Sequence, residues 1–198
     1  MYMFPLKLSF KIAALAPQIY VRDASGNEIL YVRQKLLKLK DKIRVFADSS
    51  QADQLYEIDA DRILDWSARF TFTDRQGRVL GSVRRLGTKS LWKATYEIAD
   101  AYGREIFRIE EENPWVKVLD NLLGEIPILG MFSGFFFNPR YDIKRAGTGE
   151  IALRLSKHRS MLGSEFEITN ESGQIQDDQE VAVILAVLIM TLHERHRG

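Results

Sequence analysis

Four cations in one short stretch have a spacing that could bind anions. Every second residue from 38 to 44 carries a positive charge: Lys38, Lys40, Lys42 and Arg44. Side chains along a β-strand point to alternating faces, so within one strand all four cations would share a face. Such a row would attract anionic lipid head groups, at about 1 kcal/mol for each cation near the membrane surface. A solvated outer face, or lysines that protect an edge strand, would produce the same pattern.

A second candidate is the apolar segment Pro114–Phe137. Its first part has helical spacing and predicts a short amphipathic helix that ends near Gly124, and the rest, residues 126–137, is apolar and broken by Gly and Pro. The residues that could contact a membrane or a partner are Ile128, Leu129, Met131, Phe132, Phe135 and Phe136. The segment suits insertion at a membrane surface or self-association. Alternatively the phenylalanines belong to the core, as aromatic clusters usually do.

Residues for catalysis or metal binding do not form a recognisable set. The chain has no cysteine, which excludes disulfides, thiolate metal ligands and cysteine nucleophiles. The serines have no visible base partner, and no glycine-rich phosphate loop follows a predicted strand. His193 and His196 lie three residues apart after an apolar run, where they fit the cationic end of a helix better than a metal site. We therefore expect no catalytic residues, no metal and no cofactor.

The overall composition excludes one further class of partner. The chain of 198 residues has 28 Lys and Arg against 27 Asp and Glu, so no general positive field attracts nucleic acid. Lys7 and Lys11 interrupt the apolar residues at the N-terminus, and the runs between them are shorter than a signal-peptide core. We expect a cytoplasmic protein, peripheral to a membrane if it binds lipid.

The elements that must position these residues are repeated β-hairpins. Strand-like residues lead to an Asp, a Gly follows three positions later, and a second strand-like run comes next; the pairs are Asp23–Gly26, Asp74–Gly77 and Asp100–Gly103. An Asp side chain can bond its own downstream backbone at a turn, and Gly supplies positive φ. Looser copies lie at residues 141–155 and 166–173. Twelve to fourteen short strands of this kind predict a closed antiparallel barrel or a sandwich.

The C-terminal stretch Val181–Leu192 consists of twelve residues with no charge. The acids Asp177 and Glu180 before it, and the cations after it, predict a helix about 18 Å long. That is shorter than the roughly 20 apolar residues that a bilayer core requires. Because no side of the helix is polar, every side must be covered. We predict that the strands close around this helix.

These hairpins, the basic stretch after the first of them and the apolar C-terminal helix resemble the LURP-one-related proteins. That family belongs to the Tubby C-terminal-like superfamily, which also contains the phospholipid scramblases. The resemblance extends over about Leu6–Leu192 and implies an all-β fold with one central helix, an antiparallel barrel of about twelve strands. It implies no catalytic residues. Tubby-type members bind phosphoinositide head groups and scramblase-type members act on lipids with calcium, but no motif places those sites on this chain.

We therefore expect one barrel domain over residues 1–198, with 114–137 as an apolar helical insertion. The leading functional hypothesis is a non-enzymatic module that binds lipid or a membrane surface. The cations Lys38, Lys40, Lys42 and Arg44 would contact anionic head groups, and residues 126–137 would insert nearby. The alternative is a scaffold or dimerising domain without a lipid role, in which residues 126–137 contact a second copy or another protein.

Overall fold

Twelve strands and one helix make up the described part of the chain. The computed structural model describes residues 2–11, 18–33, 42–62, 68–86, 95–112, 140–160, 163–173 and 175–195. The elements are β1 (Leu6–Lys11), β2 (Gln18–Arg22), β3 (Glu28–Arg33), β4 (Ile43–Phe46), β5 (Gln54–Ala60), β6 (Arg69–Asp74), β7 (Val79–Leu86), β8 (Thr95–Asp100), β9 (Glu105–Glu111), β10 (Arg140–Arg145), β11 (Ile151–Ser160), β12 (Gly163–Asn170) and α2 (Asp177–Arg195).

The strands form a closed antiparallel barrel. Each strand pairs with the next along the chain, and β1 completes the ring by pairing with β12, with Leu8 opposite Phe166. Closure leaves the sheet without an open edge. The predicted all-β barrel of about twelve strands around one central helix is confirmed.

The predicted hairpin turns are present, and those at Asp74 and Asp100 share one hydrogen-bond pattern. At Asp100, the carboxylate accepts bonds from the backbone N–H groups of Tyr102 and Arg104, each at 2.9 Å. At Asp74 the same bonds come from Gln76 and Arg78. Gly77 and Gly103 have φ near +80°, which residues with a side chain rarely adopt. The Asp and the Gly three positions later therefore define each turn locally.

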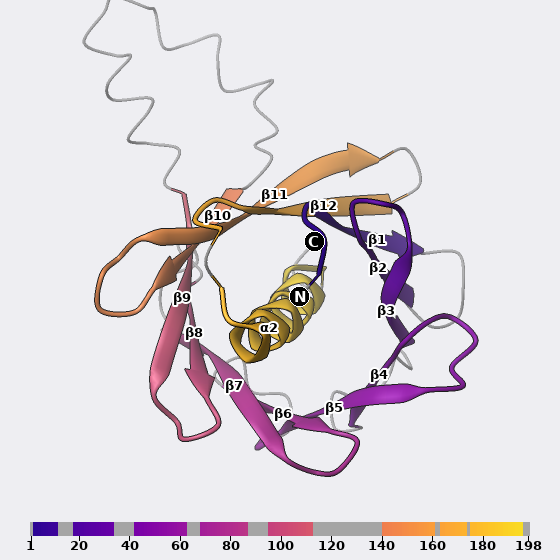
Figure 1. Cartoon of the computed structure of the whole chain (residues 1–198), viewed down its shortest axis with the longest axis horizontal. Helices are drawn as coiled ribbons and strands as arrows, with labels where there is room; N and C mark the ends of the chain where they lie inside the picture. Colours follow the sequence, from indigo (N-terminus) through magenta and orange to yellow (C-terminus); the bar gives the residue numbers. More distant parts are fainter. Residues whose placement is uncertain are drawn as a thin grey trace, which may run out of the picture.

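Helix α2 runs inside the barrel, as Figure 1 shows. From Ala182 to His193 every residue is at most 6% exposed. The strands cover all sides of the helix, which explains why the sequence gives it no polar face. Inward-facing residues of all the strands join these helix residues in one core.

Gly81 on β7 lies directly against the backbone of the neighbouring strand β8. A Cβ atom at position 81 would lie 2.5 Å from the Ala99 carbonyl oxygen and 3.5 Å from the Ala182 Cβ. Helix α2 packs most closely against β7 and β8. A side chain at position 81 would therefore overlap the β8 backbone, while Ala182 on the helix would lie at an ordinary van der Waals distance from it.

Some predicted elements differ in length or lie outside the described residues. Of the strand expected over residues 37–47, residues 37–41 lie outside the described residues, and β4 spans Ile43–Phe46 in the described part. Helix α2 continues beyond Leu192 to Arg195. The expected helix and apolar segment at 114–137 lie outside the described residues.

Candidate anion-binding surface

The barrel has two different ends. Strand direction alternates around an antiparallel barrel, so the turns after β2, β4, β6, β8 and β10 all lie at one end, together with the beginning of α2 (Figure 1). We call this the turn end. We call the opposite end of the barrel the far end. Strands β3 and β9 finish at the far end, and β4 and β10 begin there.

Both candidate segments are flanked by strand ends at the far end. Residues 34–41 follow β3 and precede β4, and residues 113–139 fall between β9 and β10. Around the ring, β5 to β8 separate β4 from β9, and β11, β12, β1 and β2 separate β10 from β3. The flanking strands thus share an end of the barrel but lie on opposite sides of it.

Two of the four predicted head-group cations are described. Arg44 is exposed on β4, between the buried residues Ile43 and Val45, so it points outward as the alternation predicts. Lys42 precedes β4, and its Nζ lies 2.6 Å from Oε1 of Glu57 on β5. The hydrogen bond and charge of Glu57 raise the pKa of Lys42, and the charge of Arg44 opposes that rise.

The other predicted contact residues lie outside the described residues. They are Lys38, Lys40, Ile128, Leu129, Met131, Phe132, Phe135 and Phe136. Their roles in contacting lipid or a partner remain predictions.

Outward-facing polar residues form a continuous row across β1 to β5 near the far end. Lys11 is opposite Gln18, Gln18 is opposite Arg33, and Arg44 is opposite Glu57. Tyr31 is opposite Phe46 and Val32 is opposite Val45, so continuing that register by one residue places Arg33 beside Arg44. The row therefore brings together cations from β1, β3 and β4.

An aromatic row lies on the same outer surface, one step toward the turn end. Tyr20 and Tyr31 are cross-strand neighbours whose rings meet edge to face, with centroids 5.0 Å apart. The Lys11 ammonium lies 4.9 Å from the centre of the Tyr20 ring. Burial raises the pKa of Tyr31, and the charge of Arg33 opposes that rise. The Tyr20 ring thus contacts Lys11, one of the cations of the outer row.

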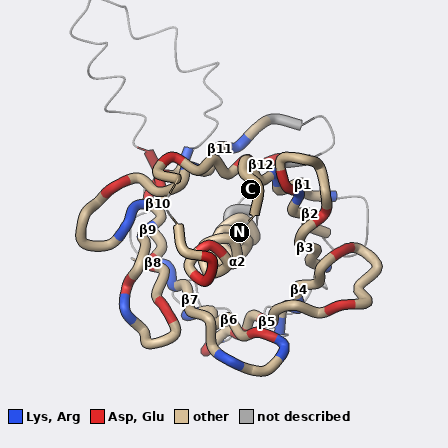
Figure 2. The backbone as a smooth tube through the Cα atoms, viewed as in Figure 1, with Lys and Arg blue, Asp and Glu red and all other residues tan. Residues whose placement is uncertain are grey.

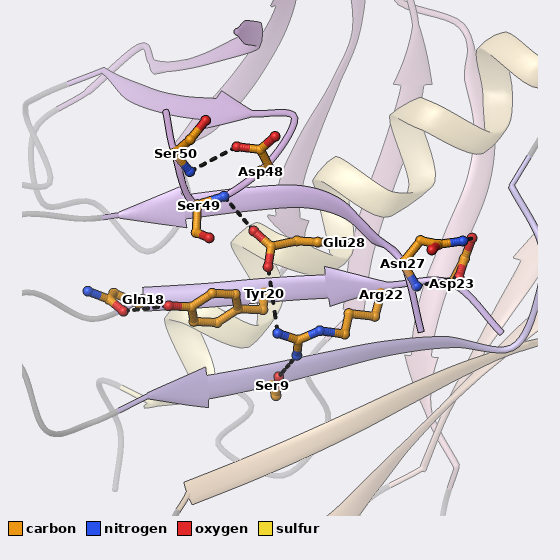
Figure 3. Close-up of polar contacts among 10 residues, drawn as sticks. All are labelled: Ser9, Gln18, Tyr20, Arg22, Asp23, Asn27, Glu28, Asp48, Ser49 and Ser50. Atoms are coloured by element: carbon orange, nitrogen blue, oxygen red, sulfur yellow. Dashed lines mark hydrogen bonds and ion pairs between the residues drawn. The ribbon is translucent and has the colours of Figure 1, made fainter. Parts of the chain in front are cut away.

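Hydrogen bonds and an ion pair also link the strands that carry this surface, as Figure 3 shows. Arg22 on β2 donates to Ser9 Oγ on β1 at 3.2 Å and pairs with Glu28 on β3 at 3.6 Å. Glu28 also accepts a bond from the backbone N–H of Ser49, in the turn between β4 and β5. The first five strands are therefore cross-linked outside the core as well as within it.

Elsewhere on the barrel many outward cations face an acid on a neighbouring strand. Arg84 contacts Glu97 at 2.9 Å, Lys144 contacts Glu110 at 2.8 Å, and Arg154 contacts Asp142 at 3.1 Å. Figure 2 shows the two signs of charge interspersed along the strands and turns. Such pairs need no external anion.

Inside the far end, His193 contacts aromatic side chains. It is 6% exposed, and its ring lies edge to face with Phe70, with centroids 5.1 Å apart. His193 lies in the last turn of α2, which continues to Arg195, and the barrel encloses its side chain. No group of three metal-binding side chains occurs among the described residues. Within the same residues, no helix has both the length and the apolar character needed to span a bilayer.

Sequence reasoning found part of this surface. It identified Lys42 and Arg44, but its set of cations did not include Lys11, which is 22 residues before Arg33 in the sequence. The signal for Lys11 is its position after the core residue Phe10, which makes it outward-facing. Its place in the row depends on how β1, β2 and β3 pair.

The structural class is thus a closed antiparallel barrel around an apolar helix, with a row of cations on its outer surface at one end. The family model for LURP-one-related proteins matches residues 28–190. The chain therefore belongs to the LURP-one-related family.

A solved structure has the same fold. The X-ray structure of a protein from Arabidopsis thaliana has 13% sequence identity and a TM-score of 0.51, covering 96% of this chain and 93% of the other. At that identity the likeness supports the fold alone. No curated protein matches the chain.

Proposed function

We propose that this protein is a non-catalytic module that binds anionic membrane surfaces with the far end of the barrel. The cations around β3 and β4 attract the head groups, and residues 126–137 insert into the interfacial region. This function would place the protein at the periphery of a membrane.

The observation that carries the proposal is the shared end of the two candidate segments. The strand ends that flank residues 34–41 and those that flank residues 113–139 all lie at the far end. A flat surface approaching that end would meet the strand ends that flank both segments, although these lie on opposite sides of the ring. One membrane contact could therefore use a basic and an apolar feature together.

Stable attachment of the protein to a membrane would combine two contributions, electrostatic attraction and apolar insertion. Each cation near an anionic surface contributes about 1 kcal/mol, and this contribution decreases within a Debye length. Insertion of apolar side chains adds a contribution that salt does not screen. Binding should thus be selective for anionic lipid and should weaken, without disappearing, as salt rises.

The test is sedimentation of the purified protein with neutral and with anionic vesicles. Measurements at about 0.1 M and about 1 M salt change the Debye length from about 10 Å to about 3 Å. We expect anionic-selective binding that weakens at high salt and weakens further in the variant Phe135→Ser. Absence of binding to anionic vesicles at both salt concentrations would contradict the proposal.

The same variant separates lipid binding from the alternative of self-association. Light scattering would show whether the wild-type protein is a dimer without vesicles and whether Phe135→Ser makes it a monomer. A dimer of that kind, combined with no vesicle binding, would favour the interaction domain and overturn lipid binding.

A further inference from the structure

Two arginines lie side by side on the outer surface near the far end. The register of β3 and β4 places Arg33 beside Arg44, and both are exposed. Neighbouring strands are about 4.8 Å apart, so one small anion can contact both guanidinium groups. The pair is attached to rigid strands whose inward residues belong to the core.

This pair lacks the neutralisation found elsewhere on the barrel. Glu57, opposite Arg44, binds Lys42. Within the described residues neither Arg33 nor Arg44 makes an ion pair. Like charges directly opposite each other in a sheet are destabilising, and a bound anion would remove that cost.

A second cross-strand arginine pair provides the contrast. Arg69 on β6 is opposite Arg84 on β7. There Nη2 of Arg84 lies 2.9 Å from the carboxylate of Glu97, so the protein itself supplies the counter-charge. Among the described residues, no acid does the same for Arg33 or Arg44.

We infer that Arg33 and Arg44 form a binding site for a phosphate monoester on a lipid head group. The planar guanidinium fork matches phosphate oxygens two at a time, so a terminal phosphate with three free oxygens can bind both arginines. A phosphodiester has only two free oxygens and a lower charge. Lys11, held over the Tyr20 ring on the other side of Gln18, adds a third cation to the row.

This inference rests on the proposed function, because it names the head group that the far end selects. The test compares vesicles containing phosphatidic acid, a monoester, with vesicles containing phosphatidylglycerol, a diester, adjusted to equal surface potential. We expect the wild-type protein to prefer phosphatidic acid. The variant Arg33→Gln/Arg44→Gln should lose that preference, with about fivefold weaker binding for each arginine removed.

Arg69→Gln is the matched control. It removes one positive charge from an outward arginine in a cross-strand pair on a nearby strand, so it should retain the preference for phosphatidic acid. Thermal melting of each variant checks that the barrel is folded. Equal loss of preference in Arg69→Gln and in the single variant Arg44→Gln would overturn the site, because general electrostatics would then explain the binding.

The remaining outcomes separate the inference from the function on which it rests. Equal binding of the wild-type protein to both vesicles would overturn the monoester site and leave anionic membrane binding intact. Binding to neither would overturn both. Soluble glycerol phosphate provides the last comparison: arginine-dependent binding to it, without binding to phosphatidic acid vesicles, would overturn the lipid as the source of the phosphate.

Discussion

The backbone N–H of Tyr2 donates a 2.8 Å hydrogen bond to Oε1 of Glu180, a residue 178 positions later. Glu180 is 1% exposed and lies in the first turn of α2. The bond therefore attaches the beginning of the chain to the beginning of the enclosed helix, at the turn end of the barrel. Carboxylates near a helix N-terminus are also favoured by the helix dipole.

Substitutions at Glu180 should separate the hydrogen bond from the charge. Glu180→Ala leaves the Tyr2 N–H without its acceptor and should lower the free energy of unfolding by about 1–3 kcal/mol. Glu180→Gln retains an acceptor oxygen, so it should lower the free energy of unfolding by less than Glu180→Ala does. Urea denaturation of the two variants measures both effects, and an alanine variant as stable as the wild type would contradict a structural role for this bond.

The pH dependence of stability should also identify Glu180. Burial raises the pKa of its carboxyl above the ordinary 4.5, and the Tyr2 N–H and the N-terminal charge oppose that rise. The folded state thus binds this proton more tightly than the unfolded state. The stabilisation that this tighter proton binding gives to the folded state is complete below pH 4.5. It is lost as pH rises through the raised pKa of Glu180. The stability of Glu180→Gln relative to wild type should therefore increase with pH over that window, and a constant difference would contradict this pKa shift.

Gly81 should tolerate no side chain. The Cβ of Gly81→Ala would overlap the Ala99 carbonyl oxygen, which belongs to a paired strand and cannot move freely. Overpacking of this kind typically costs about 1–3 kcal/mol. Gly103→Ala is the control, because it also replaces a glycine of positive φ but meets no atom within 4 Å. A smaller loss of thermal stability at position 81 than at position 103 would refute the close contact between Gly81 and the β8 backbone.

Asp100 should stabilise its turn by two separable contacts. Asp100→Asn keeps an oxygen for the backbone N–H groups of Tyr102 and Arg104 but loses the ion pair with the Arg104 side chain; Asp100→Ala loses both. We expect the alanine variant to melt at the lower temperature. Burial acts to raise the pKa of Asp100, but its hydrogen bonds and Arg104 lower it overall. Its contribution should therefore be present above pH 3.8 and decrease as pH falls through the lowered value, and a melting difference unchanged under acid would contradict this.

Removal of the central helix should prevent folding. A chain that ends before Val181 would lose about ten buried aliphatic side chains, each contributing about 1.5–3 kcal/mol on burial. It would also leave the inner faces of the strands uncovered. Circular dichroism and thermal melting test this expectation. A soluble truncated chain that melts cooperatively would show that the barrel does not depend on α2.

The sequence predicts the features that depend on neighbouring residues. The Asp100–Gly103 spacing predicts a turn because the Asp side chain bonds backbone groups only two and four residues away. The absence of a polar face over Val181–Leu192 predicts an enclosed helix because water cannot cover it.

Features that depend on pairing between distant strands could not be predicted. The placement of Arg33 beside Arg44 depends on the register of β3 and β4. The Tyr2–Glu180 bond joins opposite ends of the chain. The surroundings of His193 also depend on distant strands, because Phe70 of β6 contacts its ring and the barrel encloses it.

The most direct test of the proposed function is the environment of a dye at two single cysteines. The natural chain has no cysteine, so Phe135→Cys and Ala101→Cys can each be labelled at one site. Ala101 is exposed in the turn between β8 and β9 and reports on the turn end. With anionic vesicles, we predict a blue shift and protection from an aqueous quencher at position 135, and no change at position 101. No change at position 135, or a shift at position 101, would contradict membrane binding through the far end.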